Sequence, residues 1–470
     1  MTYWSAATGA EVDMLHDGAC RILNELGMRI EHPQAVEILA GAGAKTVNDH
    51  TVRIPRQLVE QSIERSPATF RIFDRQGGSM DVGSGVHLHL PGGTMTEVLE
   101  YPGWSRRPAT LDDVRQFTRL ADALDCIHLG IPMVEGQDAP TGMGEILTCA
   151  ETLKNTSKFS LACPVEAKAN LAFVEMAKAI AGTDNLASRP IIGLLATMLP
   201  GYAIDYNATE ALLLAAREGL PVVLMGGSIS GAQGPATMAG SLVMQAAEQL
   251  AALCVVQTVR PGSPCLMNWG QIKLDMRTAE MEEAGPEYPI AMATGAQLSR
   301  KWGVPSYACP ASDSKIVDFQ AGSEFAECML TALVAGIDVT VNAGTASKCS
   351  AASYELLIHH NEMLRNLLRV RRGMIVNDET LAVDTQIEIG IRGDYMTHPH
   401  TLQYIHDAEE FLHKDLWDAT GIRAPYEDPT ARAHARWQDL LRDHEVKVSD
   451  ADCRAVDAVV AEWDRKTSTS

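Results

Sequence analysis

The chain has 470 residues, of which 46% are hydrophobic and 21% charged, with a formal net charge of −21. This composition is typical of a globular protein with a sizeable core, and the acidic excess disfavours nonspecific binding to nucleic acid and anionic membranes while mildly favouring cationic ligands. No run approaches the ~18 apolar residues of a membrane span, and no basic segment followed by an apolar stretch opens the chain, so we expect neither a membrane anchor nor a secretion signal.

Residues 1–86 have the pattern of an N-terminal α+β extension. The segment "EVDMLHDGACRILNELG" predicts a helix, and a short strand and a second helix follow it. The later segment "TFRIFDRQGGSMDVGSG" has the alternation and glycines of a hairpin.

Residues 87–395 predict a repeated strand–helix unit. Short apolar strands begin at Pro190, Pro221, Pro264, Pro305 and Asp338, and alanine- and leucine-rich helices fill the intervals of roughly 30–40 residues. Strands that are apolar along their whole length indicate a parallel sheet covered on both faces. Because no strand is followed by a GxGxxG turn, we expect a TIM (β/α)8 barrel rather than a doubly wound sheet.

The remaining strands of this barrel are less certain in position. "KFSLACPV" and "CIHLGIPM" predict two earlier strands, and either "VHLHLPGG" or "TLAVDTQIEIG" supplies the eighth. Residues 396–470 are charged and helical, and we expect them to form a C-terminal helical extension outside the barrel. The ten cysteines are scattered without a CxxC pair, which indicates reduced thiols and a cytoplasmic protein.

Barrel enzymes place their sites on the turns that follow the strands. The glycine-rich turn "GGSISGAQGP" contains no lysine or arginine, which disfavours phosphate binding. Two interpretations stay open: small residues let the backbone approach a large flat ligand or a partner, or they form a tight structural turn. No HExxH, paired CxxC or GxSxG motif is present, so we expect neither a metal site nor a serine triad.

Several aromatic residues fall on the predicted mouth of the barrel. Aromatic faces around a cavity bind quaternary ammonium groups by cation–π attraction, and an acidic protein suits such a ligand. Trp269, Tyr202 and Tyr307 are the first candidates for this cage, with Tyr206 and Phe319 behind them.

Two long blocks carry a resemblance to a known family: "GAQGPATMAGSLVMQAAEQLAALCVVQTVRPGSP" and "SDSKIVDFQAGSEFAECMLTALVAGIDVTVNAG". They resemble the trimethylamine methyltransferase superfamily of corrinoid-dependent enzymes, and the likeness extends over most of the chain. The resemblance implies a TIM barrel that accepts a methylated amine and docks the cobalamin of a separate corrinoid protein, whose Co(I) receives the methyl group. No cofactor would be held tightly by the chain itself.

The family divides by chemistry. Its archetype carries pyrrolysine, whereas this chain has only standard residues and resembles the branch that demethylates quaternary amines such as glycine betaine, proline betaine or carnitine. A quaternary ammonium leaves as a neutral tertiary amine, so the site mainly has to align the methyl carbon with cobalt. By this resemblance the corrin would face the turn glycines Gly226, Gly227, Gly231 and Gly234.

The remaining roles are hypotheses for this substrate class. Asp313 would add negative charge to the cage, although a strand-end aspartate is as often a helix cap. Lys315, Asn268 and His360 are candidates to receive the carboxylate of a betaine. No catalytic residue is assigned, because the nucleophile would be cobalt on another protein. We also expect a homo-oligomer.

Two other functions stay open from the sequence. One is a barrel lyase or isomerase that uses Lys315 or Asp313 for acid–base chemistry. The other is a betaine-binding protein without turnover.

Overall fold

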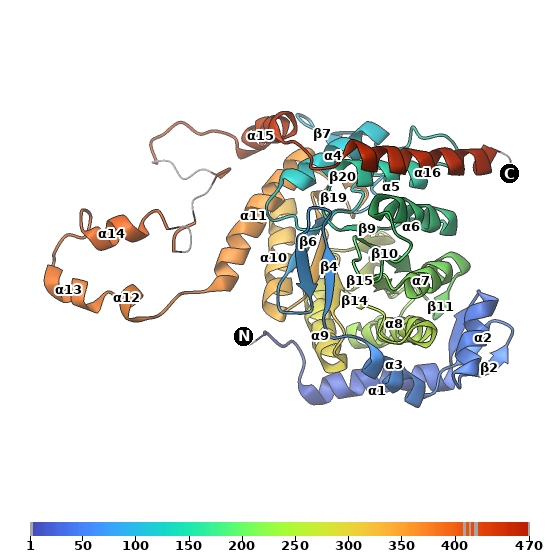
Figure 1. Ribbon diagram of the computed structural model, residues 1–470. Helices are drawn as coiled ribbons and strands as arrows, with labels where there is room; N and C mark the ends of the chain where they lie inside the picture. Colours follow the sequence, from blue (N-terminus) through green and yellow to red (C-terminus); the bar gives the residue numbers. More distant parts are fainter. Residues whose placement is uncertain (1–2, 408–409, 413–414, 418–421, 469–470) are drawn as a thin grey trace.

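The centre of the molecule is a curled parallel sheet surrounded by helices (Figure 1). The computed structural model describes residues 3–407, 410–412, 415–417 and 422–468. In spatial order the seven strands of the sheet are β6 (Leu88–Pro91), β18 (Val339–Ala343), β17 (Ser306–Ala308), β14 (Cys265–Trp269), β12 (Val222–Met225), β10 (Ile192–Thr197) and β9 (Ser160–Ala162). All neighbouring pairs are parallel.

The predicted alternation of strands and helices is confirmed for most of this sheet. Each strand that the sequence places after Pro190, Pro221, Pro264, Pro305 or Asp338 begins within two residues of that position. The alternating helices are α6 (Ala167–Ala181), α7 (Tyr206–Glu218), α8 (Met238–Val259), α9 (Glu287–Trp302), α10 (Phe319–Ala335) and α11 (Tyr354–Arg372). They cover the outer face of the sheet, which explains why the strands are apolar on both sides.

An irregular segment takes the place of an eighth strand. The backbone N–H groups of His128 and Leu129 donate to the carbonyl of His89 in β6. On the other side, Gly130 pairs with Ser160 of β9 in a single parallel bridge. The predicted strand "CIHLGIPM" is therefore not a regular strand, and the described residues form a curled seven-stranded sheet rather than eight regular barrel strands.

The choice left open for the remaining strand is now settled. "VHLHLPGG" contains β6, which pairs with β18. "TLAVDTQIEIG" is helical instead, in α12 (Asp378–Leu381) and α13 (Val383–Ile389). Its alternation of apolar and polar residues indicated a strand, but it lies outside the sheet and has no strand to pair with (Figure 1).

The N-terminal elements follow the expected order of helix, strand, helix and hairpin. They are α1 (Gly9–Glu25), β1 (Met28–Ile30), α2 (Pro33–Gly41), β2 (Lys45–Asn48), β3 (Thr51–Arg53), α3 (Arg56–Arg65), β4 (Phe70–Phe73) and β5 (Ser79–Val82). Strand β1 also pairs with β11 (Ala203–Ile204), which follows β10. The N-terminal segment is thus joined by backbone hydrogen bonds to a loop at the carboxyl side of the main sheet. The division of the chain at residues 86 and 395 stays a prediction.

Helix α8 is the described element that bears on the expectation of no membrane span. Among the described helices it is the one long and apolar enough, by length and composition, to cross a membrane. It is nevertheless mostly buried, with α1, α3 and α7 packed against it. Buried polar residues such as Gln245 and Glu248 interrupt its apolar run, which is why the sequence shows no continuous span.

Two helices of the C-terminal part pack on the outside of the body, as expected. Helix α15 (Pro429–Asp443) contacts α11 and α4 (Leu111–Ala123), and α16 (Asp450–Ser468) contacts α6 and α5 (Gly144–Asn155). Between α11 and α15, the helices α12, α13 and α14 (Pro399–Tyr404) extend away from the body (Figure 1). None of these three helices has a buried residue. We call residues 373–407, which contain them, the arm.

Short strands complete the structure around the main sheet. A four-stranded sheet joins β7 (Glu97–Glu100), β8 (Ser105–Pro108), β19 (Thr345–Ala346) and β20 (Ala351–Ala352). A three-stranded sheet joins β13 (Ile229–Ser230), β15 (Ile272–Asp275) and β16 (Glu280–Glu282). Strands β15 and β16 form an antiparallel hairpin in the long connection between β14 and α9.

Candidate functional site

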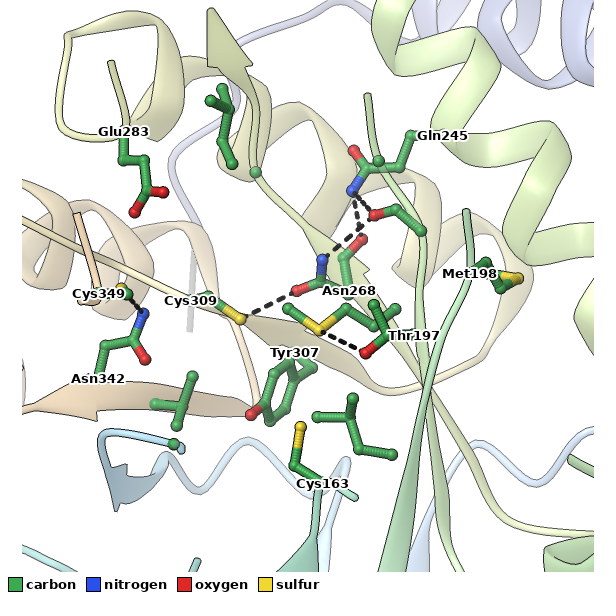
Figure 2. Close-up of a pocket in the computed structure, with 18 of the residues that line it drawn as sticks. Cys163, Thr197, Met198, Gln245, Asn268, Glu283, Tyr307, Cys309, Asn342 and Cys349 are labelled. Carbon is green, nitrogen blue, oxygen red and sulfur yellow. Dashed lines mark hydrogen bonds between the residues drawn. The ribbon is translucent and has the colours of Figure 1, made fainter. Parts of the chain in front are cut away.

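A cavity of about 400 Å³ lies at the carboxyl ends of the main strands. Residues at or just after the ends of all seven strands of the main sheet line it, so the site is where the strand-end rule predicts it. Figure 2 shows these side chains converging from different strands: Cys163 after β9, Thr197 and Met198 on and after β10, Asn268 on β14, Tyr307 and Cys309 on and after β17, and Asn342 on β18.

The β15–β16 hairpin contributes the one charged side chain. Glu283 follows β16 directly, and its carboxylate is directed into the cavity (Figure 2). Every other described residue that lines the cavity is uncharged or a neutral thiol or phenol. Lys273 of β15 forms ion pairs with Glu282 at 3.1 Å and Glu287 at 2.8 Å, which fastens the hairpin to the start of α9.

The position of Glu283 is set by the loop that follows β17. Asp313 in that loop accepts hydrogen bonds from the backbone N–H groups of Glu283, at 3.0 Å, and Ala284, at 3.3 Å. Burial raises the pKa of the Glu283 carboxyl, and the negative charge of the Asp313 carboxylate raises this pKa further. A hydrogen bond with Cys349 and the positive charge of Lys348 lower the same pKa in part. A carboxylate in such surroundings is stabilised when a cation binds beside it.

An amide network holds the wall of the cavity beside α8. Gln245 donates from Nε2 to the carbonyl oxygens of Gly226, at 2.8 Å, and Asn268, at 3.0 Å. Gln249 donates to the same Asn268 carbonyl at 2.7 Å. The side-chain oxygen of Asn268 accepts from the Cys309 thiol at 3.5 Å. These contacts orient the Asn268 side chain toward the cavity.

The three cysteines of the cavity are protonated thiols. Burial raises the pKa of Cys163 to about 11, and it raises the pKa values of Cys309 and Cys349 further. A thiol with so high a pKa is a poor nucleophile at neutral pH. These side chains therefore act as small apolar wall residues, and the cavity carries the charge of Glu283 alone.

The aromatic residues expected to form a cage do not gather around one cavity. Tyr307 lines the cavity. Trp269 is 0% exposed and donates from Nε1 to the Ser299 hydroxyl at 2.7 Å, on the helix side of the sheet. Successive residues of a strand face opposite sides, so Trp269 points away because its neighbour Asn268 points in.

The other three aromatic candidates lie elsewhere. Tyr202 lines a separate groove between α1 and α8. Tyr206 stacks on His32, with ring centroids 4.7 Å apart. Phe319, at the start of α10, is 90% exposed. The sequence located these residues near strand ends but did not indicate which way they point.

The polar candidates separate in the same way. Asn268 lines the cavity, whereas Asp313 acts on it only through the hairpin backbone. Lys315 is exposed and is not a lining residue. His360 is 0% exposed in α11, where it stacks on Phe325 and accepts a hydrogen bond from the Gly344 N–H at 2.9 Å.

The glycine-rich turn divides into two parts, and close approach to a large ligand or a partner stays a prediction. Gly226 and Gly227 line the cavity. Gly231 and Gly234 do not line it, and instead close a tight turn: the Gly231 N–H donates to the Gly234 carbonyl, and the Gly234 N–H donates to Ile229. Gly231 has a φ of +84°, a conformation that favours glycine.

Sequence reasoning missed several cavity residues. Cys163, Cys309 and Asn342 lie in the strand-end turns, so position alone could have singled them out, although no chemical pattern marked them. Glu283 lies well beyond the end of β14, in a hairpin whose return to the cavity depends on tertiary pairing with β13. No local signal identifies it.

Exposed apolar side chains lie on the loops on the same side of the sheet. Val165 follows β9, Leu199 follows β10, Met276 lies in the β15–β16 hairpin, and Ile316 and Phe319 follow β17. We call these five residues the rim. Large apolar side chains exposed on one side of a cavity are a feature of surfaces that contact a partner.

The fold and the cavity define an α/β protein that binds a small molecule at the carboxyl ends of a curled parallel sheet. Residues 3–468 match the model of the trimethylamine methyltransferase (MTTB) family. The chain belongs to this family and is a methyltransferase.

Individual relatives agree with this assignment. The chain is 30% identical to the glycine betaine methyltransferase of Desulfitobacterium hafniense (strain Y51), over 94% of this chain and 93% of that protein. It is 28% identical to the trimethylamine methyltransferase MttB of D. hafniense (strain DSM 10664 / DCB-2), over 92% and 88% respectively. The monomethylamine methyltransferase of Methanosarcina barkeri shares the fold, with a TM-score of 0.53, 10% identity, and coverage of 78% of this chain and 77% of that one.

Proposed function

We propose that this protein transfers a methyl group from a quaternary amine to the Co(I) centre of a separate corrinoid protein. The observation that carries the proposal is the single carboxylate, Glu283, in an otherwise uncharged cavity of about 400 Å³. A small site with one negative charge complements a small molecule with one positive charge. The similarity to a glycine betaine methyltransferase supports the same class of substrate.

The reaction needs little acid–base chemistry from this chain. When the C–N bond of a quaternary ammonium breaks, both electrons stay on nitrogen, and a corrinoid protein would supply the Co(I) nucleophile that takes the methyl group. The amine leaves neutral, so no proton is transferred. The charge of Glu283 holds the ammonium, and apolar walls that include Leu195 and Val341 exclude water and restrict its orientation.

The surroundings of the cavity fit a large flat group on a partner protein. Gly226 and Gly227 line the cavity without side chains that would reduce its opening. The rim residues, among them Phe319 and Met276, present exposed apolar surface on the same side. Cobalamin would thus be presented by the corrinoid protein and not held by this chain alone.

The test is a reconstituted single-turnover reaction. Purified protein, a quaternary amine and excess Co(I) cobalamin are incubated without oxygen, and the demethylated tertiary amine is measured by mass spectrometry. We expect product only when both Co(I) and active protein are present. Product without cobalamin, or binding of the amine without any methyl transfer to free or protein-bound corrinoid, would overturn the proposal.

The lyase or isomerase alternative receives no support from the placement of its residues. The Asp313 carboxylate is bonded to the hairpin backbone, and Lys315 is an exposed side chain that does not line the cavity. Neither can reach a proton of a molecule bound in the cavity without rearrangement of the loop.

A further inference from the structure

The described lining of the cavity has a charged partner for a positive charge and no cationic partner for a negative one. No lysine, arginine or histidine is present among its described lining residues. Of the residues expected to receive a substrate carboxylate, Lys315 is exposed elsewhere and His360 is buried in the helical layer. Asn268 lines the cavity, but its amide carries no charge.

Two lysines at the β15–β16 hairpin, Lys348 and Lys273, are engaged outside the cavity. The Lys348 ammonium lies 3.3 Å from the Glu280 carboxylate. Lys273 is paired with Glu282 and Glu287. Both lysines therefore face acidic groups on the hairpin and the start of α9, and neither lines the cavity.

A zwitterion and a simple cation should bind in this cavity with different affinities. A betaine brings a carboxylate into a half-buried space that already holds Glu283, and an unpaired buried charge is strongly unfavourable. An ammonium alcohol has the same trimethylammonium head but ends in a hydroxyl, which Asn268 or Tyr307 can hydrogen-bond. A ligand with one positive charge and no negative charge therefore neutralises the Glu283 carboxylate and leaves no charge in the cavity unpaired.

We propose that the cavity selects a quaternary ammonium monocation that lacks a carboxylate, and that Glu283 is the residue that determines this preference. The inference rests on the proposed function, because it takes the cavity to be the amine site. It separates this chain from the glycine betaine methyltransferase of D. hafniense, whose named substrate carries a carboxylate.

Three ligands that share one shape test the inference with the full-length protein. Choline and glycine betaine have the same ammonium head, and 3,3-dimethylbutan-1-ol replaces the charged nitrogen of choline by carbon. Calorimetric titration should give choline a dissociation constant at least roughly tenfold lower than either of the other two. Glycine betaine that binds as tightly as choline would overturn this inference and leave the proposed function intact. Failure of both onium ligands to bind would contradict both.

Two matched variants of the β15–β16 hairpin region test whether Glu283 determines the preference for a monocation. Glu283→Gln removes the charge in the cavity, and Glu280→Gln removes an exposed charge from the same hairpin. We expect E283Q to lose the preference for choline over glycine betaine and over 3,3-dimethylbutan-1-ol, and E280Q to keep both preferences. Thermal unfolding verifies that both variants are folded, and if E283Q is not, Glu283→Ala removes the same charge with a smaller side chain. A preference that the folded charge-removing variant leaves unchanged would show that Glu283 does not determine it.

Discussion

The carboxylate of Asp313 accepts a hydrogen bond from the backbone N–H of Glu283 at 3.0 Å. Through this contact the loop after β17 holds the β15–β16 hairpin against the cavity. Glu324 supports the loop in turn, since its carboxylate accepts from the Asp313 N–H at 2.9 Å and the Ser312 hydroxyl at 2.7 Å. Asp313 is therefore a positioning residue for the one charge in the site.

Replacement of Asp313 by asparagine should weaken amine binding without unfolding the protein. An amide accepts at only one of its two polar atoms, so one of the two backbone bonds to the hairpin is lost, at a cost of about 1 kcal/mol. We expect a several-fold rise in the dissociation constant for choline, measured by calorimetry. The control is Lys315→Ala, an exposed neighbour that should bind normally. An unchanged affinity in D313N would mean that the hairpin holds its position without this contact.

Phe319→Ser should separate partner docking from amine binding. The side chain is 90% exposed and does not line the cavity, so the free energy of unfolding should change by no more than about 0.5 kcal/mol. We expect methyl transfer to a corrinoid protein to need more of that protein for half-maximal rate, with unchanged affinity for the amine. An unaltered dependence on the corrinoid protein would remove Phe319 from the docking surface.

Stability should fall in mild acid because of buried histidines. Burial lowers the pKa of His87 to about 3 and the pKa values of His128 and His359 to about 4. Below the unfolded-state value near 6.5 the unfolded chain binds protons that the folded chain does not, so the folded state loses stability steadily as the pH falls toward 4. The slope should reach about 1.4 kcal/mol per pH unit for each histidine. Above pH 7 these residues should have no effect.

The variant His87→Phe tests whether a buried histidine causes the loss of stability in acid. The ring keeps a similar shape but cannot be protonated, and the nearby Arg371 charge, which also lowers the His87 pKa, no longer matters. Chemical denaturation between pH 4.5 and 7.5, a range that stays above the folded pKa and crosses the unfolded one, should show a shallower decline for this variant. An identical decline would assign the acid sensitivity to other groups.

The arm should mediate self-association. Its helices have no buried residue, yet Ile387 is 73% exposed and Ile391 is 99% exposed. Apolar side chains so exposed are stabilised when another surface covers them, and we propose that a second copy of the chain does so. Light scattering should show an oligomer for the natural chain and a smaller species for the double variant Ile387→Asp, Ile391→Asp. The neighbouring Glu388→Gln serves as control, and a monomeric natural chain would contradict the proposal.

The sequence predicted the strand–helix repeat well because proline-initiated apolar strands and glycine-terminated helices are local features. Helix α7, for instance, ends at Gly219 in the left-handed conformation, as its sequence indicates. The segment at residues 127–131 could not be predicted as irregular, because its backbone path depends on distant partners. The Lys158 ammonium donates hydrogen bonds to the carbonyl oxygens of Ala121, Leu124 and Ile127. The local sequence around residues 127–131 does not indicate these contacts.

The candidate site was predictable in location but not in composition. The strand-end rule found Asn268 and Tyr307, yet it also selected Trp269, because the rule does not say which face a side chain takes. The sequence predicted that aromatic rings surround the ligand, whereas the charged group that lines the cavity is the carboxylate of Glu283. This residue reaches the cavity from the β15–β16 hairpin. Its position follows from tertiary pairing between β13 and β15, which the residues around Glu283 do not encode.

The irregular segment between β6 and β9 has a consequence for how the protein behaves in a crowded solution. Gly130 exchanges hydrogen bonds with the β9 region, since its N–H donates to the Phe159 carbonyl and its carbonyl accepts from the Leu161 N–H. A free strand edge at this point would offer the same groups to any other extended chain. By occupying that edge, a stretch of a few residues without regular structure protects the sheet from strand addition, and its loosening would expose the edge of β9 to pairing with another chain.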